Sequence, residues 1–426
     1  MPNESTVLEN YFIFTSNLSH DRAREVIEKE KEQCRGGTNT SWSQLLTMLL
    51  NLSTAEKTYH SLTFLTPRTG SVFLRKEQSL KSVYQSLMVD TRNSMEVSDT
   101  SDQMSQVCQD LSRVFQMRTG MIDIYEKLCN LTSTSFLTDP FKEILPTLAQ
   151  ILTDLKKDHS DVIKSWLVVL EYECGILLDF LTSCVTMMDN NYFDSIMLLQ
   201  RGGENMTRWD TVVQARETRK LGFASSWLRV SGTVELQLYT WFQRLKSALM
   251  SKFSLYFYST LSQQTTPADM KSLCSKLSVD QTARLSSYQK RLDAVSVSVL
   301  YDASGQSNYQ GPGYHFHDKD NVSLAGLDLF PLVYTTGFQS GQHWPNVVMI
   351  ISDQSSDLSN DKTVPFFDVG VGATYFLHQI EPRFYIVIIF EGRRNEKDSA
   401  INGFIQETVF QLRCCRIFAS LKPGYK

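Results

Sequence analysis

The spacing of apolar residues changes period once along this chain, and that change constrains the fold more than any other feature. Up to about residue 292, apolar side chains recur every three or four residues, which is typical of amphipathic helices. After Asp293, the segment VSVSVLYD (295–302) alternates strictly, as a half-buried strand does. The sequence therefore predicts an α+β protein in which an N-terminal long-helix bundle precedes a C-terminal α/β domain.

Four long stretches carry the helical period, and helices of this length suit a bundle. They cover residues 41–62, 102–131, 161–186 and 233–262. In the first stretch, Ser41 is the predicted N-cap and Glu56 and Lys57 are expected to face outward. The fourth is apolar on more than one face, so it should lie centrally. Turns are expected at Gly- or Pro-containing breaks, at 36–37, 69–71, 139–141, 201–205 and 231–233.

The C-terminal part mixes strand and helix patterns. Further strands are predicted at 346–352, 374–380 and 384–391, with a tight hairpin turn at 381–383 and a helix at 397–413. We therefore predict a helical bundle over 1–265 and an α/β domain over 266–426, with a long loop insertion at about 303–345.

Composition excludes several classes of function. A formal net charge of −4 and a pI of about 6.0 give no basic surface for nucleic acid. The most apolar helical stretch (166–181) contains three acidic residues, so no membrane span is predicted. The N-terminus lacks the pattern of a signal peptide, and no two of the eight cysteines form a C-x-x-C pair. We expect a cytoplasmic protein with reduced cysteines in its core.

The segment GYHFHDKDN (313–321) is the strongest candidate for chemistry. His315 and His317 are two residues apart and could bind zinc or iron if other ligands joined them, namely Asp318, Asp320, His343 or His378. The segment lacks the fixed frame of known metal motifs and follows a Gly-Pro-Gly run, which favours a loop. We therefore predict no metal and no cofactor, but a partner-contact loop made by Tyr314, His315, Phe316, His317, His343 and Trp344.

Other motifs also point away from catalysis. DVGVGATYF (368–376) lacks the third glycine of a dinucleotide fingerprint and leads into a strand, so its glycines are expected to form a turn. Asp353 and Asp357 have no partner base, and the chain has no phosphate-binding P-loop and no G-x-S-x-G nucleophile motif. The basic run ARETRK (215–220) is either an exposed helix face or a docking site for an acidic partner. We predict that the protein is not an enzyme.

Several strings resemble a known family. AEKTYHSLTFL (55–65), HWPNVVMIISDQSSDLSN (343–360), TYFLHQIEPRFYIVIIFE (374–391) and IFASLKPG (417–424) are similar to the family of the second subunit of the KICSTOR complex. The resemblance implies a non-enzymatic scaffold whose C-terminal part is similar to roadblock or longin modules. Such complexes lie on the lysosomal surface and hold the GATOR complex there. GATOR accelerates GTP hydrolysis on Rag GTPases, so TOR kinase signalling falls when amino acids are scarce.

The same resemblance implies the partners. These are the large scaffold and propeller-type subunits of KICSTOR, the GATOR complex and, indirectly, the Rag GTPases; self-association through the α/β domain is a further hypothesis. Two alternatives stay open. One is a longin-like trafficking adaptor outside nutrient signalling, and the other is a metal-dependent hydrolase that uses the His315/His317 loop.

Overall fold

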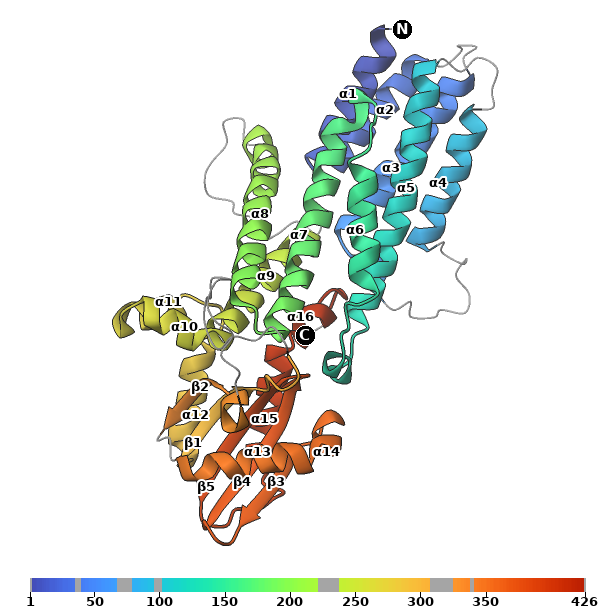
Figure 1. The fold of residues 1–426 in the computed structure, drawn as a ribbon. Helices are drawn as coiled ribbons and strands as arrows, with labels where there is room; N and C mark the ends of the chain where they lie inside the picture. The colour runs from blue at the N-terminus through green and yellow to red at the C-terminus, as the bar shows by residue number, and fades with distance from the viewer. Residues whose placement is uncertain are drawn as a thin grey trace.

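The helical part is an elongated assembly of antiparallel helices, and the sheet lies at its far end (Figure 1). The computed structural model describes residues 2–34, 40–66, 79–95, 102–220, 237–306, 325–337 and 341–424. The helices before the sheet are α1 Pro2–Ser16, α2 His20–Gln33, α3 Thr40–His60, α4 Leu80–Met95, α5 Asp102–Cys129, α6 Ile144–Leu155, α7 Lys164–Met188, α8 Tyr192–Lys220, α9 Gln237–Tyr256, α10 Tyr258–Gln264, α11 Pro267–Ser275 and α12 Gln281–Leu292.

The four predicted long helices are present. They correspond to α3, α5, α7 and α9, and α9 is buried on several sides as its all-round apolar pattern predicts. Helix α3 begins at Thr40, so Ser41 lies inside it and the prediction that Ser41 is the N-cap was wrong. Within the described residues, no helix is both long and apolar enough to cross a lipid bilayer.

The predicted turns have different outcomes. The break at 139–141 is a turn after the short 3₁₀ helix η2 (Ser133–Leu137). The turn predicted at 201–205 was wrong, because α8 runs through Gly202 and Gly203 without a break. The breaks at 36–37, 69–71 and 231–233 lie outside the described residues.

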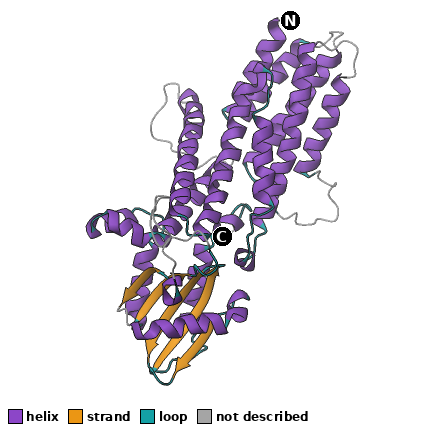
Figure 2. Ribbon diagram, in the orientation of Figure 1, coloured by secondary structure: helices purple, strands orange, loops and turns teal. Residues whose placement is uncertain are grey.

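Among the described residues, five strands form one antiparallel sheet (Figure 2). Their order is β2-β1-β5-β4-β3. Their bounds are β1 Ser296–Tyr301, β2 Leu332–Gly337, β3 Val364–Asp368, β4 Ala373–Glu381 and β5 Phe384–Glu391. The predicted hairpin between β4 and β5 is confirmed, with Glu381 opposite Phe384. Strand β1 is buried on both faces, rather than on one, because it lies second from the edge of a sheet that is covered on both sides.

The segment predicted as a strand at 346–352 is part of a helix, α13 (Trp344–Asp353), so that prediction was wrong. Its buried residues Val347, Ile350 and Ile351 follow helical spacing, and Pro345 lies in the first turn, where a helix tolerates proline. Strands β2 and β3 were not predicted, and β2 lies within the stretch that was expected to be a loop insertion. The remaining helices are α14 Ser355–Ser359, α15 Ser399–Leu412 and α16 Cys415–Ala419.

Each face of the sheet has its own core. One face, with residues such as Val299, Phe376 and Ile388, joins a hydrophobic core that continues without interruption into the helical bundle. The other face packs under α13 and α14, through Val347, Leu377 and others. The fold is therefore α+β, as predicted. No disulfide joins the eight cysteines, and all except the partly buried Cys34 are buried, so seven of them lie in the core as predicted. Their reduced state stays a prediction. The division at residue 265 stays a prediction.

Candidate interaction surface

The predicted contact residues divide into two groups. Tyr314, His315, Phe316 and His317 lie outside the described residues, as do Asp318 and Asp320, which were considered as further metal ligands. His343 and Trp344 lie at the start of α13: His343 is buried, and Trp344 is half-buried and packs against the outer core of the sheet. Their role in partner contact stays a prediction.

His343 takes part in a network that fixes the start of α13 to the sheet. Its Nδ1 lies 2.8 Å from the hydroxyl oxygen of Tyr375 on β4. Asn346 Nδ2 donates to Asp368 Oδ2 at 2.6 Å and to the Tyr375 hydroxyl at 3.2 Å. Burial lowers the pKa of His343, which favours the neutral form of its ring. The network holds α13 over β3 and β4.

Asp368 also shapes the hairpin that follows β3. Its Oδ1 accepts hydrogen bonds from the backbone N–H groups of Gly370 and Val371, at 2.7 and 3.1 Å. Gly372 has a φ of +68°, which glycine adopts without strain. The glycines of DVGVGATYF thus form a turn before β4, as predicted.

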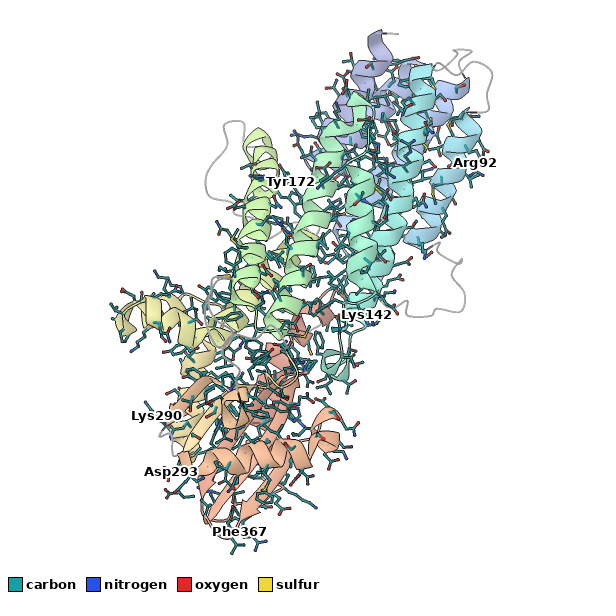
Figure 3. The ribbon with its side chains drawn as sticks, in the orientation of Figure 1. Arg92, Lys142, Tyr172, Lys290, Asp293 and Phe367 are labelled. Atoms are coloured by element: carbon teal, nitrogen blue, oxygen red, sulfur yellow. The ribbon has the colours of Figure 1, made fainter. Side chains whose placement is uncertain are left out.

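Exposed and half-buried apolar side chains lie on β3, on the hairpin that follows it and on α13. Val369 at the hairpin tip is 83% exposed, and Val371 and Met349 are also exposed. Half-buried Phe366 and Phe367 lie on the edge strand β3, and Figure 3 shows Phe367 at the end of the molecule away from the bundle. We call these residues the β3 edge surface: Met349, Phe366, Phe367, Val369 and Val371.

The β3 edge surface combines two properties of protein-binding sites. Among the described strands, β3 pairs only with β4, so its other side presents open backbone hydrogen-bonding groups. A strand added there would form backbone hydrogen bonds and cover the apolar side chains. The arrangement therefore suits recognition of another protein.

The described residues offer no metal centre. No group of three or more His, Cys, Asp or Glu side chains among them is placed to hold a metal ion. His378, considered above as a metal ligand, is buried with Nε2 3.2 Å from Asp361 Oδ1 and Nδ1 3.1 Å from Thr363 Oγ1. Both ring nitrogens are therefore engaged in structural contacts. The His315/His317 pair lies outside the described residues.

A buried arginine joins the sheet to the helical part. Arg413, at the end of α15, donates from Nη1 to Asp361 Oδ1 at 2.7 Å and to Ser133 Oγ at 2.6 Å, and from Nε to the carbonyl of Ile380 at 2.6 Å. The hydrogen bond from His378 and the charge of Arg413 hold the pKa of Asp361 below its usual range. Because Ser133 belongs to η2, this joint connects the bundle to β4 and to the loop before β3.

A second buried joint lies between α9 and the β4–β5 hairpin. Lys252 forms an ion pair with Glu381, and the hydroxyl of Tyr256 donates to the other Glu381 oxygen at 2.7 Å. Although burial disfavours the charged ammonium, the Glu381 carboxylate raises the pKa of Lys252. The Tyr256 ring stacks on Phe384, with ring centroids 4.0 Å apart. A buried pair of this kind fixes how the two elements are oriented.

A third buried cluster lies inside the bundle. Arg118 on α5 donates two hydrogen bonds to Glu56 on α3, at 2.9 and 2.7 Å, and one to Glu173 on α7, at 2.7 Å. The hydroxyls of Tyr59 and Tyr125 donate to Glu173 at 2.5 and 2.9 Å. The prediction that Glu56 faces outward was wrong: its side chain is fully buried. Burial opposes its ionisation, but Arg118 outweighs that effect and lowers the pKa of Glu56.

The sequence contained a pattern that could have revealed this cluster. Glu56 lies four residues after Leu52 and three before Tyr59, so it is on the apolar stripe of α3. Lys252 similarly lies among apolar neighbours in MSKFSLYFY. A charged residue on an apolar stripe indicates a buried partner, but it does not identify which distant residue the partner is.

Comparisons with known proteins place the chain in one family. The family described as "KICSTOR complex C12orf66 like" matches residues 1–426. A protein of Danio rerio called KICSTOR subunit 2 is 33% identical over 442 residues, covering 100% of this chain and 97% of that protein. The Xenopus laevis protein of the same name is 33% identical over 437 residues, covering 99% and 97%. The chain therefore belongs to the KICSTOR complex C12orf66-like family.

Proposed function

We propose that this protein is a non-enzymatic subunit of a KICSTOR complex and helps to recruit the GATOR complex to the lysosomal surface. In this role it lowers TOR kinase signalling when amino acids are scarce. The observation that carries the proposal is the family match over the whole chain, with relatives named KICSTOR subunit 2. Such a subunit acts by binding and not by catalysis, because a scaffold raises the local concentration of its partners.

The structure supports a scaffold in two ways. Buried ion pairs at Arg413 and Lys252 fix the sheet to the helical bundle, so surfaces on both parts are held in one arrangement. The β3 edge surface then presents an open strand and apolar side chains at the end of the molecule away from the bundle (Figure 3). We assign this surface to contact with another KICSTOR subunit.

Affinity purification from amino-acid-starved cells tests the proposal. The tagged protein should bring down the large scaffold and propeller-type KICSTOR subunits together with GATOR components, identified by mass spectrometry. The double variant Val369→Asp with Val371→Asp should lose at least one KICSTOR subunit, because charges would enter an apolar contact. Val89→Asp, at a 54% exposed position on α4, is the matched control and should retain all of them.

Other results would favour one of the two alternative functions. Trafficking factors without KICSTOR subunits would favour the longin-like adaptor. Stoichiometric zinc or iron in the purified protein, lost in the double variant His315→Ala with His317→Ala, would favour the metal-dependent hydrolase.

Self-association through the sheet is a second part of the proposal. In the free protein, two copies could align their β3 strands edge to edge, which would satisfy the open backbone groups of both until another KICSTOR subunit takes the place of one copy. Light scattering at micromolar concentration should then give the mass of a dimer for the wild type and of a monomer for the Val369→Asp, Val371→Asp variant. A monomeric mass for the wild type would contradict this part alone.

A further inference from the structure

Two arginines that follow strand β5 lie against phenylalanine rings at the end of the sheet. Arg393 Cζ is 5.5 Å from the centroid of the Phe367 ring on β3, and Arg394 Cζ is 4.9 Å from the centroid of the Phe390 ring on β5. Both arginines are exposed, and within the described part of the chain no carboxylate pairs with either guanidinium. The aromatic rings therefore hold two positive charges that no acidic side chain neutralises.

Hydrogen bonds fix the backbone on either side of Arg393 to the hairpin that joins β3 to β4. The N–H of Gly392 donates to the carbonyl of Gly372 at 2.8 Å. Thr374 Oγ1 donates to the carbonyl of Gly392 at 2.7 Å and accepts a hydrogen bond from the N–H of Arg394 at 3.0 Å. The charge of Arg393 is thus held at a defined place beside the edge strand β3.

The register of the sheet separates these arginines from the acidic residues next to them in the sequence. Phe367 and Phe390 pair with the same residue of β4, so their rings share one face of the sheet, the face that continues into the bundle. Asp368 and Glu391 pair with the preceding residue of β4, so their side chains point to the opposite face, which α13 covers. Arg393 therefore adds positive charge on a face from which both neighbouring carboxylates point away.

Pro365 indicates which backbone groups of β3 are open. Proline has no N–H to donate, so within a sheet it lies on an edge strand with its nitrogen toward the open side. Backbone direction alternates along an antiparallel strand, so Phe367, two residues later, directs its N–H and C=O to the same open side. A strand added there would place one residue directly opposite Phe367, with its side chain on the face that carries Arg393.

We propose that the β3 edge surface binds an extended segment of another KICSTOR subunit that has an acidic residue opposite Phe367, paired with Arg393. The inference rests on the proposed function, which assigns this surface to such a subunit, and it adds the charge and the position of the contact. The backbone of Phe367 can bind any extended segment, whereas Arg393 selects an acidic one. A second copy of this chain would place Pro365 or Phe367 there, and neither is charged.

Fluorescence anisotropy with short peptides tests the charge preference on the full chain. The probe is a labelled heptapeptide with Glu at its centre, Val on either side of it and Thr elsewhere, a composition that favours an extended strand. Two reference peptides replace Glu with Gln or with Lys. We expect the Glu peptide to bind about threefold more tightly than the Gln peptide and about tenfold more tightly than the Lys peptide. Self-association does not alter these ratios, because all three peptides compete with the same second copy.

A charge reversal at Arg393 locates the preference. In Arg393→Glu the order should reverse, with the Lys peptide binding more tightly than the Glu peptide, because the selecting charge has changed sign. Arg92→Glu is the matched control, a charge reversal at an exposed position on α4, at the other end of the molecule from Phe367 (Figure 3). It should keep the order of the wild type. Circular dichroism confirms that each variant is folded.

Hydrogen exchange at single-residue resolution tests the position of the contact. The Glu peptide should slow exchange of the Phe367 N–H, which the added strand would bond. The N–H of Phe366, which faces β4, should exchange at the same rate with and without the peptide. Slower exchange in α4 but not at Phe367 would place the peptide elsewhere and contradict the proposal.

Two further results would overturn this inference. One is the same order of affinities in the wild type and in Arg393→Glu, and the other is no measurable binding of any peptide at about 1 mM. Neither result touches the proposed function if KICSTOR subunits still co-purify with the tagged protein. Conversely, the expected peptide results without co-purifying KICSTOR subunits would contradict the proposed function and keep the acidic preference of the edge.

Discussion

Arg118 on α5 pairs with carboxylates of two other helices, α3 and α7, in the interior of the bundle. Its guanidinium compensates two buried carboxylates, Glu56 and Glu173, and its Cζ lies 4.0 Å from the centroid of the Tyr59 ring. We predict that Arg118→Met lowers the free energy of unfolding by about 3–5 kcal/mol, because both carboxylates lose their counter-charge inside the protein. Urea denaturation measures this loss. Arg92→Met, at an exposed position, should change stability by less than about 0.5 kcal/mol; similar losses in the two variants would contradict the role of the cluster.

Asp361 gives a pH-dependent contribution at the joint with Arg413. Its pKa in the folded protein is lower than the value of about 3.9 for an unfolded aspartate. The stabilisation is therefore fully present above that unfolded value and is lost as the pH falls toward the folded pKa. We predict that Asp361→Asn is less stable than the wild type at pH 7, and that the difference shrinks as the pH falls below about 4. Thermal unfolding at a series of pH values measures it.

The control for that experiment is Asp353→Asn, at an exposed position on α13. Its unfolding temperatures should run parallel to those of the wild type at every pH. If the difference in unfolding temperature between Asp361→Asn and the wild type stays constant with pH, Asp361 acts only through packing.

At the residue scale, the sequence contains a signal for one buried charge but none for the ion pairs between distant residues. Glu56 lies on an apolar stripe and could have been identified as buried. The pairing of Asp361 with Arg413 could not, since the two are separated along the chain by most of the sheet and α15, and only the folded arrangement brings them within 2.7 Å. The same holds for Lys252 with Glu381.

Among the elements, α7 and α8 pack side by side (Figure 1), and Gly202 of α8 lies directly against Phe180 of α7. A Cβ atom at Gly202 would lie 2.6 Å from Cε1 of Phe180, whose ring is fully buried. We predict that Gly202→Ala destabilises the protein by about 1–3 kcal/mol through overpacking, even though alanine favours helix more than glycine does. Chemical denaturation tests this.

Gly203 is the matched control for Gly202. A Cβ at Gly203 would meet Lys246 Nζ at 2.9 Å, which is the end of a flexible side chain and can move away. Gly203→Ala should therefore be neutral or stabilise by up to about 1 kcal/mol. Equal destabilisation by the two substitutions would mean that packing against Phe180 is not the reason why position 202 is sensitive to substitution.

At the element scale, sequence patterns predicted elements correctly where the pattern was long or where two strands adjoined a tight turn. The β4–β5 hairpin and the helices α5 and α15 follow directly from their spacing. The run VVMII was mistaken for a strand because β-branched residues favour strands, whereas Pro345 and the burial of only Val347, Ile350 and Ile351 suit a helix against a sheet. Edge strands β2 and β3 are short and half-exposed, so their patterns are weak.

Across the whole molecule, the buried joints predict that bundle and sheet unfold together. Glu381→Ala would leave Lys252 buried without its counter-charge, at a cost of about 3–5 kcal/mol. Hydrogen exchange should then show equal losses of protection in β5 and in the distant α5, because one core spans both. Loss confined to the sheet would contradict this coupling. Lys362→Ala, at an exposed ion pair with Asp357, should leave both unchanged.

For the whole molecule, the sequence predicted the fold class and the family but not the interaction surface. The α+β order follows from the change of period, and the family resemblance rests on unusual strings such as HWPNV. The β3 edge surface depends on residues brought together from β3, the hairpin that follows it and α13, so no single segment of the sequence revealed it.

The central claim is that this protein recruits GATOR to the lysosome, and quantitative lysosomal localisation of GATOR tests it most directly. In amino-acid-starved cells that lack the protein, the account predicts that GATOR is lost from lysosomes, and that it returns with the wild type or Val89→Asp but not with Val369→Asp, Val371→Asp. GATOR that stays on lysosomes without the protein would contradict the claim.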